Sequence, residues 1–145
     1  MSCCCTKKET ISCENAPAAI GPYSVAVSTG SLVFVSGQLG LDKETGSLVA
    51  GGIQAQARKA LENMKAILES AGLSMDDVVK TTVFLLDMGQ FAEMNAVYGE
   101  FFTSAFPARS AIQVAGLPKN GIVEIEAIAV KQHDHEDKNC CCNEN

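Results

Sequence analysis

Long hydrophobic runs are absent from the sequence. Its longest apolar runs, such as residues 83–86 and 127–130, are four residues long, whereas a helix that crosses a bilayer needs about 20. Met1 is followed by a serine, three cysteines and charged residues rather than by an apolar stretch, so we expect no secretory signal peptide. The sequence therefore predicts a protein that neither spans a membrane nor is secreted.

Basic residues are also scarce. The 145 residues include 17 acidic and 11 basic side chains, which gives a net charge of −6. Binding to nucleic acid through its phosphates requires a basic surface, so we do not expect a nucleic-acid partner. The two histidines, His133 and His135, both lie in the acidic C-terminal segment. Because general acid–base cleavage of RNA commonly uses histidine, this distribution disfavours a ribonuclease.

Cysteine is not spread through the chain. Six of the seven cysteines form two triplets, at residues 3–5 and 140–142, and only Cys13 remains. A disulfide framework would distribute its cysteines over the fold, so we expect a reducing, cytoplasmic environment. We interpret residues 1–14 and 132–145 as tails and residues 15–131 as one globular domain.

The thiol triplets leave their own role open. Thiolates bind soft metal ions such as zinc or cuprous copper, and the two histidines of the C-terminal tail could join them. Adjacent cysteines, however, lack the two-residue spacer of ordinary zinc sites, so we favour solvated tails that hold no metal. Redox capture by the thiols and lipidation of the N-terminal triplet are the remaining alternatives.

Between the tails, the hydrophobic pattern alternates between strand-like and helix-like segments. Alternating or β-branched runs predict strands, and apolar residues at spacings of three and four predict helices. In chain order we predict strands at 25–28 and 32–36, a hairpin-type loop at 42–46, a helix at 53–71, a strand at 78–86, a helix at about 91–102, and strands at 110–115 and 122–131. Gly37 is expected to end the second strand, and Asn120-Gly121 to join the last two strands as a hairpin.

This order of elements predicts an α+β domain in which two helices cover one face of a mixed sheet. The last strand is apolar on both faces, so its second face must also be buried. A chain of this length leaves another copy of itself as the expected cover. The pattern therefore predicts a homo-oligomer.

The last strand also carries two carboxylates on a largely apolar strip. By the two-residue period, Glu124 and Glu126 share a face with Ile122, Ile128 and Val130. Carboxylates in such a place are costly unless they are hydrogen-bonded or paired. Either they meet structural partners at a rim or an interface, or they belong to a site.

Arginine is rare, and one of the two arginines is oddly placed. Arg58 falls on the polar face of the first predicted helix, whereas Arg109 follows Pro107 at the start of an apolar strand. A guanidinium held there suits bidentate binding of a carboxylate or phosphate. The alternative is a structural ion pair between Arg109 and Glu124 or Glu126.

Two further places could bind a ligand. Tyr23 follows a Gly-Pro turn and could orient a polar ligand through its hydroxyl, although such a tyrosine also serves in packing. Ser36 and Gly37 stand where a strand is expected to end, so their backbone groups could approach a ligand closely.

Several motifs together resemble the RidA (YjgF) family. They are Ala16-Pro17-Ala18-Ala19-Ile20-Gly21-Pro22-Tyr23, Val35-Ser36-Gly37-Gln38, Phe106-Pro107-Ala108-Arg109-Ser110, Leu117-Pro118-Lys119 and Val123-Glu124-Ile125-Glu126-Ala127. They occur in order over residues 15–131. The resemblance implies a chorismate-mutase-like fold of the bacillus type, assembled as a homotrimer with three sites between subunits.

The resemblance also implies an activity: hydrolysis of reactive enamines and imines, such as 2-iminobutanoate and 2-iminopropanoate, to 2-oxo acids and ammonia, without a metal or organic cofactor. By position, Arg109 matches the arginine that binds the substrate carboxylate, and Glu124 the acid associated with water and the leaving nitrogen. Tyr23 matches the site tyrosine, Gly37 (beside Ser36) the backbone contact, and Asn95 a polar residue near the neighbouring subunit's cleft.

Two other functions remain as alternatives. One is an L-PSP-type endoribonuclease, the other a non-enzymatic binder of small carboxylates. The sequence also departs from the family pattern at one position, because Ala111 stands where many bacterial relatives have cysteine. Thiol chemistry is therefore not expected there.

Overall fold

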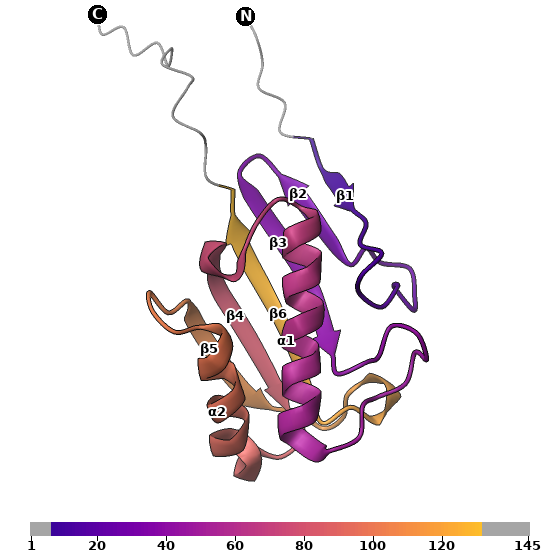
Figure 1. Cartoon of the computed structure of the whole chain (residues 1–145), viewed down its shortest axis with the longest axis vertical. Helices are drawn as coiled ribbons and strands as arrows, with labels where there is room; N and C mark the ends of the chain where they lie inside the picture. Colours follow the sequence, from indigo (N-terminus) through magenta and orange to yellow (C-terminus); the bar gives the residue numbers. More distant parts are fainter. Residues whose placement is uncertain (1–6, 132–145) are drawn as a thin grey trace, which may run out of the picture.

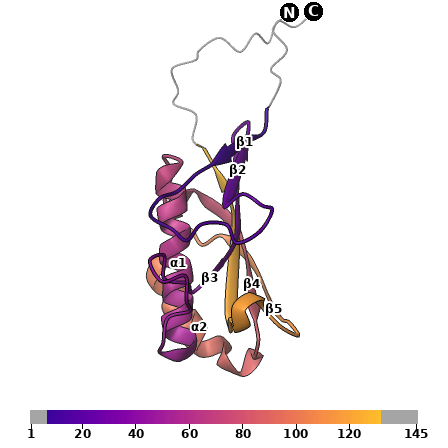
Figure 2. The same ribbon diagram turned by 90° about the vertical axis from the view of Figure 1, so that its right-hand side faces the viewer.

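In the computed structural model, the alternating apolar segments form six strands, which make up one mixed sheet (Figure 1). The structure describes residues 7–131. In chain order the elements are β1 (Glu9–Ile11), β2 (Ala26–Thr29), β3 (Leu32–Leu39), α1 (Gly52–Ser70), the 3₁₀ turn η1 (Met75–Asp77), β4 (Val78–Leu85), η2 (Met88–Gln90), α2 (Phe91–Phe101), β5 (Ala108–Gln113), η3 (Pro118–Asn120) and β6 (Val123–Val130). Both helices lie on the same side of the sheet (Figure 2). The predicted α+β class, the mixed sheet and the one-sided helix layer are confirmed.

The strand order is β1-β2-β3-β6-β4-β5, and all neighbouring strands are antiparallel except β4 and β5. Helix α2 carries the chain from the end of β4 back to the start of β5, and such a crossover connection produces a parallel pair. Strand β4 therefore separates β5 from β6, and the prediction that the last two strands form a hairpin is wrong. The expected turn is instead built on η3, where Lys119 (φ 55°) and Asn120 (φ 59°) adopt left-handed conformations.

The core lies between α1, α2 and the covered face of the sheet. On α1 the buried apolar residues recur at the predicted spacings of three and four: Ile53, Ala57, Ala60, Leu61, Met64, Ile67 and Leu68. They meet Val123, Ile125, Ala127 and Ala129 of β6, all at most 3% exposed. Each fully buried valine, leucine, isoleucine or methionine among them stabilises the fold by about 1.5–3 kcal/mol through the area it removes from water.

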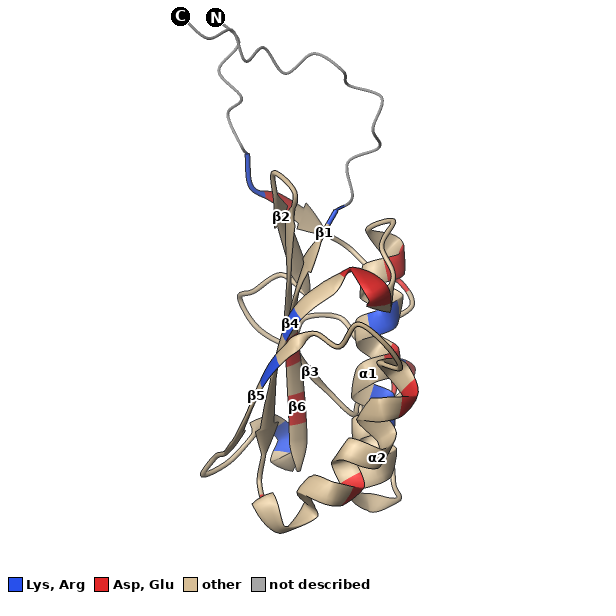
Figure 3. Cartoon of the chain, turned by 90° about the vertical axis from the view of Figure 1, so that its left-hand side faces the viewer, with Lys and Arg blue, Asp and Glu red and all other residues tan. Residues whose placement is uncertain are grey.

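The second face of the sheet has no cover within residues 7–131 (Figure 2). Pairing across strands places Phe34 beside Ile128, and Phe84 between Glu124 and Ile112, on this open face. Phe34 and Ile112 are 38% and 46% exposed. The acidic residues of β6, Glu124 and Glu126, lie on a strand in the middle of the sheet, where Figure 3 colours them red. They share one face, as the two-residue period predicts, and the structure shows that this is the face opposite the helices.

Strand β3 does not end at Gly37, as the sequence had indicated. It continues to Leu39 through a β-bulge, because Val35 pairs with Ala127 whereas Gln38 pairs with Ile125. Two residues of β3, Ser36 and Gly37, thus oppose the single Glu126 of β6. Glycine marks a bulge here rather than a strand end, an ambiguity that a strand glycine carries in general.

The N-terminal boundary also differs from expectation. Strand β1 lies within residues 1–14, the segment interpreted as a tail, and its three residues pair with β2. Cys13 is a free thiol that packs against the core. The two cysteine triplets, His133 and His135 lie outside the described residues.

Candidate active site

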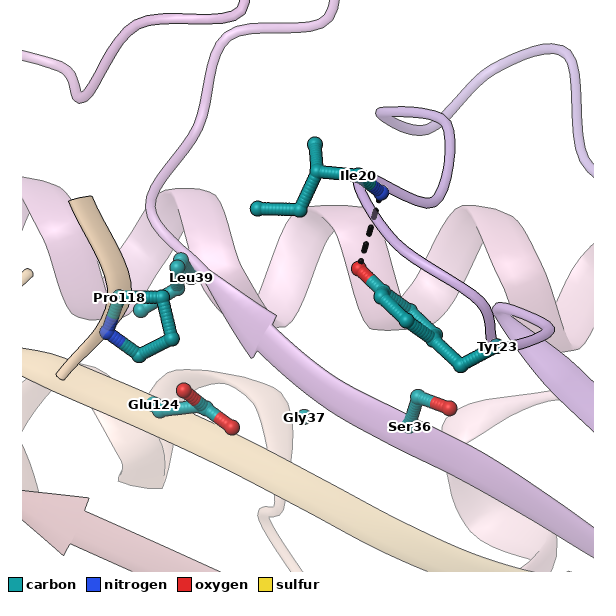
Figure 4. A pocket seen from close by; sticks show the side chains of 7 residues that line it. All are labelled: Ile20, Tyr23, Ser36, Gly37, Leu39, Pro118 and Glu124. Carbon is teal, nitrogen blue, oxygen red and sulfur yellow. Dashed lines mark hydrogen bonds between the residues drawn. The ribbon is translucent and has the colours of Figure 1, made fainter.

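A cavity of about 270 Å³ opens beside Glu124 on the open face of the sheet (Figure 4). Its lining comprises Ile20, Tyr23, Ser36, Gly37, Leu39, Pro118 and Glu124. The loop before β2, the bulge of β3, the η3 turn and β6 each contribute to it. Four of the predicted site residues, Tyr23, Ser36, Gly37 and Glu124, are thereby brought together.

Glu124 is the only ionisable carboxyl group among these lining residues. Burial raises the pKa of its carboxyl group above the ordinary value, and the nearby charge of Glu126 raises this pKa further. No lysine, arginine or histidine lines the cavity. Glu124 is therefore suited to exchange a proton closer to neutral pH than an exposed glutamate would be.

Gly37 is required by the position of Glu124. A Cβ atom added at Gly37 would come to 1.9 Å from Oε1 of Glu124 and 2.7 Å from its carboxyl carbon. The φ angle of Gly37 is not in the left-handed region, so the demand is one of space and not of backbone conformation. The bulge presents the one residue type that lets the carboxylate lie against β3.

Tyr23 and Ser36 form the other side of the cavity (Figure 4). The Tyr23 hydroxyl accepts a hydrogen bond of 3.3 Å from the Ile20 backbone N–H, which leaves its own O–H available to donate. The Ser36 hydroxyl donates to the Ser24 carbonyl oxygen at 2.7 Å. Ser36 thus ties the tyrosine-bearing loop to β3, and its oxygen can still accept a hydrogen bond from a ligand.

Two polar residues on the buried face of α1 support the cavity, and neither was predicted from the sequence. Asn63 donates to the carbonyl oxygens of Leu39 (3.2 Å) and Leu41 (3.0 Å). Gln56 accepts from the Ile122 N–H at 3.1 Å. They fix the end of β3 and the start of β6 on either side of the carboxylate. The available signal was their location on an otherwise apolar helix stripe, where a polar residue needs partners.

Arg109 lies at a different cavity, of about 430 Å³, on the helix side of the sheet edge. Asn95, Tyr98, Gly99, Phe106 and Pro107 line it together with Arg109. Nη1 of Arg109 donates to Oδ1 of Asn95 at 2.8 Å. This is the one hydrogen bond of the Arg109 side chain among the described residues, so the guanidinium keeps further donors for a ligand.

Within one protomer, Arg109 and Glu124 do not meet. In the parallel ladder Arg109 pairs with the buried Thr81 and points to the helix side, whereas Glu124 pairs with Phe84 on the open face. The ion pairs within residues 7–131 do not include Arg109. The structural ion pair considered from the sequence is therefore absent from the described part of the protomer, and each group faces its own cavity.

Other features limit the chemistry of this region. Ala111 packs against the core and supplies no thiol. No group of three or more histidine, cysteine or acidic side chains in residues 7–131 is placed to hold a metal ion. In the same range, no helix has the length and hydropathy needed to cross a membrane.

The Glu124 cavity and the Arg109 cavity offer complementary chemical groups. The Glu124 cavity offers a proton-exchanging carboxyl group, the Tyr23 hydroxyl and an apolar wall. The Arg109 cavity offers a guanidinium for a carboxylate. Together they would suit a small anionic substrate that undergoes proton transfer during attack by water.

Comparison with known proteins places the domain among close relatives. A family model described as Endoribonuclease L-PSP matches residues 13–131. A protein of Salmonella typhimurium named 2-iminobutanoate/2-iminopropanoate deaminase is 56% identical over 127 residues, which cover 86% of this chain and 98% of that protein. A Bos taurus protein of the same name is 52% identical over 124 residues, covering 86% of this chain and 90% of its own length.

The similarity extends to the fold of a solved structure. Escherichia coli TdcF with bound serine is 49% identical, with a TM-score of 0.82, and covers 86% of this chain and 99% of its own. The range matched by the family model, residues 13–131, includes both the Glu124 cavity and the Arg109 edge.

Proposed function

The chain belongs to the Endoribonuclease L-PSP family, the RidA (YjgF) family indicated by its motifs, and from this membership we propose that it hydrolyses reactive imines and enamines of small amino acids. It is an imine deaminase that acts on 2-iminobutanoate and 2-iminopropanoate, as the names of its relatives state for them. The products are the 2-oxo acid and ammonia. The observation that carries the chemistry is the Glu124 carboxyl group, whose pKa is raised by burial in a cavity that no cation lines.

The complete site forms between two copies of the chain. Because Arg109 and Glu124 belong to opposite faces of one sheet, a substrate can reach both only where the Arg109 edge of one protomer meets the Glu124 cavity of another. The open face, with its exposed Phe34 and Ile112, supplies the apolar surface for such contacts. We assign the assembly to the chorismate-mutase-like homotrimer that the family resemblance implies, with one site at each of its interfaces.

Each residue then has a defined task. Arg109, held by Asn95, binds the substrate carboxylate and fixes its orientation. Starting from the protonated imine, the unprotonated Glu124 accepts a proton from the attacking water as oxygen bonds to the imine carbon, which gives a neutral carbinolamine. The protonated Glu124 then returns that proton to the nitrogen. As the C–N bond breaks to release ammonia, the C=O bond of the 2-oxo acid forms, and the hydroxyl proton passes to Glu124 and from there to ammonia or solvent. Tyr23 donates a hydrogen bond to the bound substrate, and the bulge at Ser36 and Gly37 keeps the backbone close to it.

The reaction makes modest demands. An imine carbon is already electrophilic, above all when its nitrogen is protonated, so water suffices as nucleophile. Positioned proton transfer contributes about 10²–10⁴-fold, which is enough for a reaction that also proceeds unaided. The substrates arise where pyridoxal-phosphate enzymes dehydrate threonine or serine, and we place the activity in the cytoplasm with them.

The description of the family model keeps RNA cleavage as a second candidate. The cavity around Glu124 is lined by no cation and no histidine, and the chain has a net charge of −6. Both features oppose the binding of a polyanion. RNA cleavage by highly purified protein that disappears in Arg109→Ala would favour this candidate over the deaminase.

The test is a coupled assay. A threonine dehydratase generates 2-iminobutanoate in the presence of semicarbazide, which traps the imine that has not been hydrolysed. The wild-type protein should lower the semicarbazone yield, and Arg109→Ala should lose this effect while remaining folded. Arg58→Ala removes the other arginine, which pairs with Glu100 on the helix surface, and should behave as the wild type. A protein that binds 2-oxobutanoate but does not lower the yield would be a carboxylate binder and not an enzyme.

A further inference from the structure

The guanidinium of Arg109 rests on one face of helix α2. Its Cζ lies 4.6 Å from the ring centroid of Tyr98 and 5.4 Å from that of Phe91, and Asn95 accepts its hydrogen bond. Phe91, Asn95 and Tyr98 are spaced by four and three residues, so they share one helix face. Three residues of α2 thus contact the side chain of Arg109, which belongs to β5.

We propose that Tyr98 is a positioning residue for imine hydrolysis, which fixes the orientation of Arg109 before the substrate arrives. This inference rests on the proposed role of Arg109 as the group that binds the substrate carboxylate. Tyr98 itself is 6% exposed, so it acts through Arg109.

Tyr98 is anchored independently of Arg109. Its hydroxyl lies 2.7 Å from Oγ1 of Thr81, which is fully buried in β4, and its ring packs on Phe102 with centroids 4.6 Å apart. Thr81 is in turn the backbone partner of Arg109 in the parallel ladder. Thr81, Tyr98 and Arg109 are therefore connected pairwise. Thr81 pairs with Arg109 in the ladder and contacts the Tyr98 hydroxyl, and the Tyr98 ring contacts the Arg109 guanidinium.

These contacts reduce the entropy that Arg109 loses when it binds a ligand. A free arginine side chain loses much rotamer freedom when it binds a ligand, and a guanidinium already held between two rings and an amide has lost that freedom in advance. The attraction between a cation and an aromatic face contributes as well, because the Tyr98 ring is shielded from water. Burial also raises the pKa of Tyr98, which keeps its phenol neutral.

The expected effect falls on binding and not on the chemical step. The carboxylate is held equally in the ground state and in the transition state, so loss of its orientation raises KM and leaves kcat nearly unchanged. A residue that merely stabilised the fold would lower the melting temperature without changing KM.

The experiment compares three leucine or phenylalanine variants in the full-length protein. Tyr98→Leu removes the ring beside the guanidinium, and we expect about a tenfold rise in KM with kcat within about twofold of wild type. Tyr98→Phe keeps the ring, so its KM should rise by no more than about twofold. Phe101→Leu is the matched control, because it removes a partly buried ring of the same helix that has no ring contact with Tyr98 or Arg109 among the described residues, and it should leave KM unchanged.

Direct binding of 2-oxobutanoate, measured by titration calorimetry, supplies a second readout. Its Kd should rise about tenfold in Tyr98→Leu and remain unchanged in Phe101→Leu. Wild-type affinity in Tyr98→Leu, or an equal loss in the two leucine variants, overturns the inference. If Tyr98→Leu does not fold, Tyr98→Met removes the ring with a smaller loss of volume, and an unchanged Kd there overturns the inference as well. A fully active Arg109→Ala would instead overturn the proposed function itself.

Discussion

Arg109 and Glu124 lie on opposite faces of the same sheet. Arg109 follows its ladder partner Thr81 to the helix side, and Glu124 follows Phe84 to the open side. A substrate the size of an imino acid cannot contact both groups of one protomer through the sheet. The proposed deaminase mechanism therefore requires that the Arg109 edge of one copy of the chain meets the Glu124 cavity of another.

Mixed assemblies provide the first prediction. Arg109→Ala and Glu124→Gln subunits should each be inactive alone, but co-expressed subunits should form some interfaces that combine an intact Arg109 with an intact Glu124. Random mixing in equal amounts in a closed ring gives about a quarter of such interfaces, so about a quarter of wild-type imine hydrolysis should return. The coupled dehydratase assay measures it.

A control mixture tests whether the recovered activity requires an intact Arg109 and an intact Glu124 at the same interface. Mixtures of Arg109→Ala with an Arg109→Ala, Glu124→Gln double variant contain no intact pair and should stay inactive. Absence of recovery in the first mixture, with mixed oligomers verified by native mass spectrometry, would contradict a site shared between subunits.

The contact between Gly37 and Glu124 gives the second prediction. Gly37→Ala places a methyl group where the Glu124 carboxylate now lies, so either the carboxylate or the bulge must move. We expect a loss of imine hydrolysis of about 100-fold or more, since small displacements of catalytic groups have effects of this size. Gly116→Ala is the matched control, because a Cβ there meets nothing within 4 Å. Full activity in Gly37→Ala would show that the position of Glu124 is not critical.

The raised pKa of Glu124 leads to the third prediction. Burial and the charge of Glu126 raise this pKa in the folded state, so the folded protein binds the proton more tightly than the unfolded chain. The stability that results is complete below the ordinary pKa of glutamate and is lost as the pH rises through the raised folded value. Glu124→Gln cannot ionise, so its stability relative to wild type should be greater at about pH 7 than at about pH 4.

Urea unfolding at several pH values and a fixed protomer concentration measures this difference. Glu126→Gln should lower the pKa of Glu124 towards its ordinary range, which an NMR titration of the side-chain carboxyl carbon can follow. A stability difference that does not depend on pH would show that Glu124 titrates like an exposed residue.

The open face gives the fourth prediction. Phe34 is 38% exposed beside Ile128, and a carboxylate in its place would remain uncompensated in an apolar interface. Phe34→Asp should therefore sediment as a monomer and lose imine hydrolysis, while its circular dichroism stays that of a folded domain. Lys65→Asp, on the exposed side of α1, introduces the same side chain and should leave assembly and activity intact. An active, fully assembled Phe34→Asp protein would place the interface elsewhere.

Periodicity was sufficient to predict the main elements. The helix-facing residues of α1 repeat at helical spacing, and β4 and β6 are long β-branched or apolar segments, so these elements were predicted to within two residues. The alternation of β6 also placed Glu124 and Glu126 on one shared face, and the structure identifies it as the face away from the helices. Strand β1 was missed because Glu9, Thr10 and Ile11 form a short, mostly exposed edge, which has no burial pattern to detect.

The relation between the Glu124 cavity and the Arg109 cavity could not be predicted in the same way. The face on which Arg109 lies depends on its pairing with Thr81, and this pairing exists because α2 makes β5 parallel to β4. Local spacing carries no information about such a long-range register. The motifs named Tyr23, Ser36, Gly37 and Glu124 as site residues, and these four line one cavity, but the separation of Arg109 from them required the topology.

The bulge at Ser36 and Gly37 decides which neighbour Glu124 has. Since side chains alternate along a strand, the inserted residue turns Leu39 towards the open face beside Glu124, and turns Gln38 towards the face of Ile125. Removal of Gly37 would abolish the bulge but leave Gln38 opposite Ile125 and Leu39 opposite Glu124, so that Ser36 alone would oppose Glu126. The side chain of Ser36 would then enter the space that the glycine leaves to the Glu124 carboxylate. The length of the chain at this single point thus decides whether that carboxylate fits against β3, and a one-residue deletion would weaken catalysis with both Arg109 and Glu124 still present.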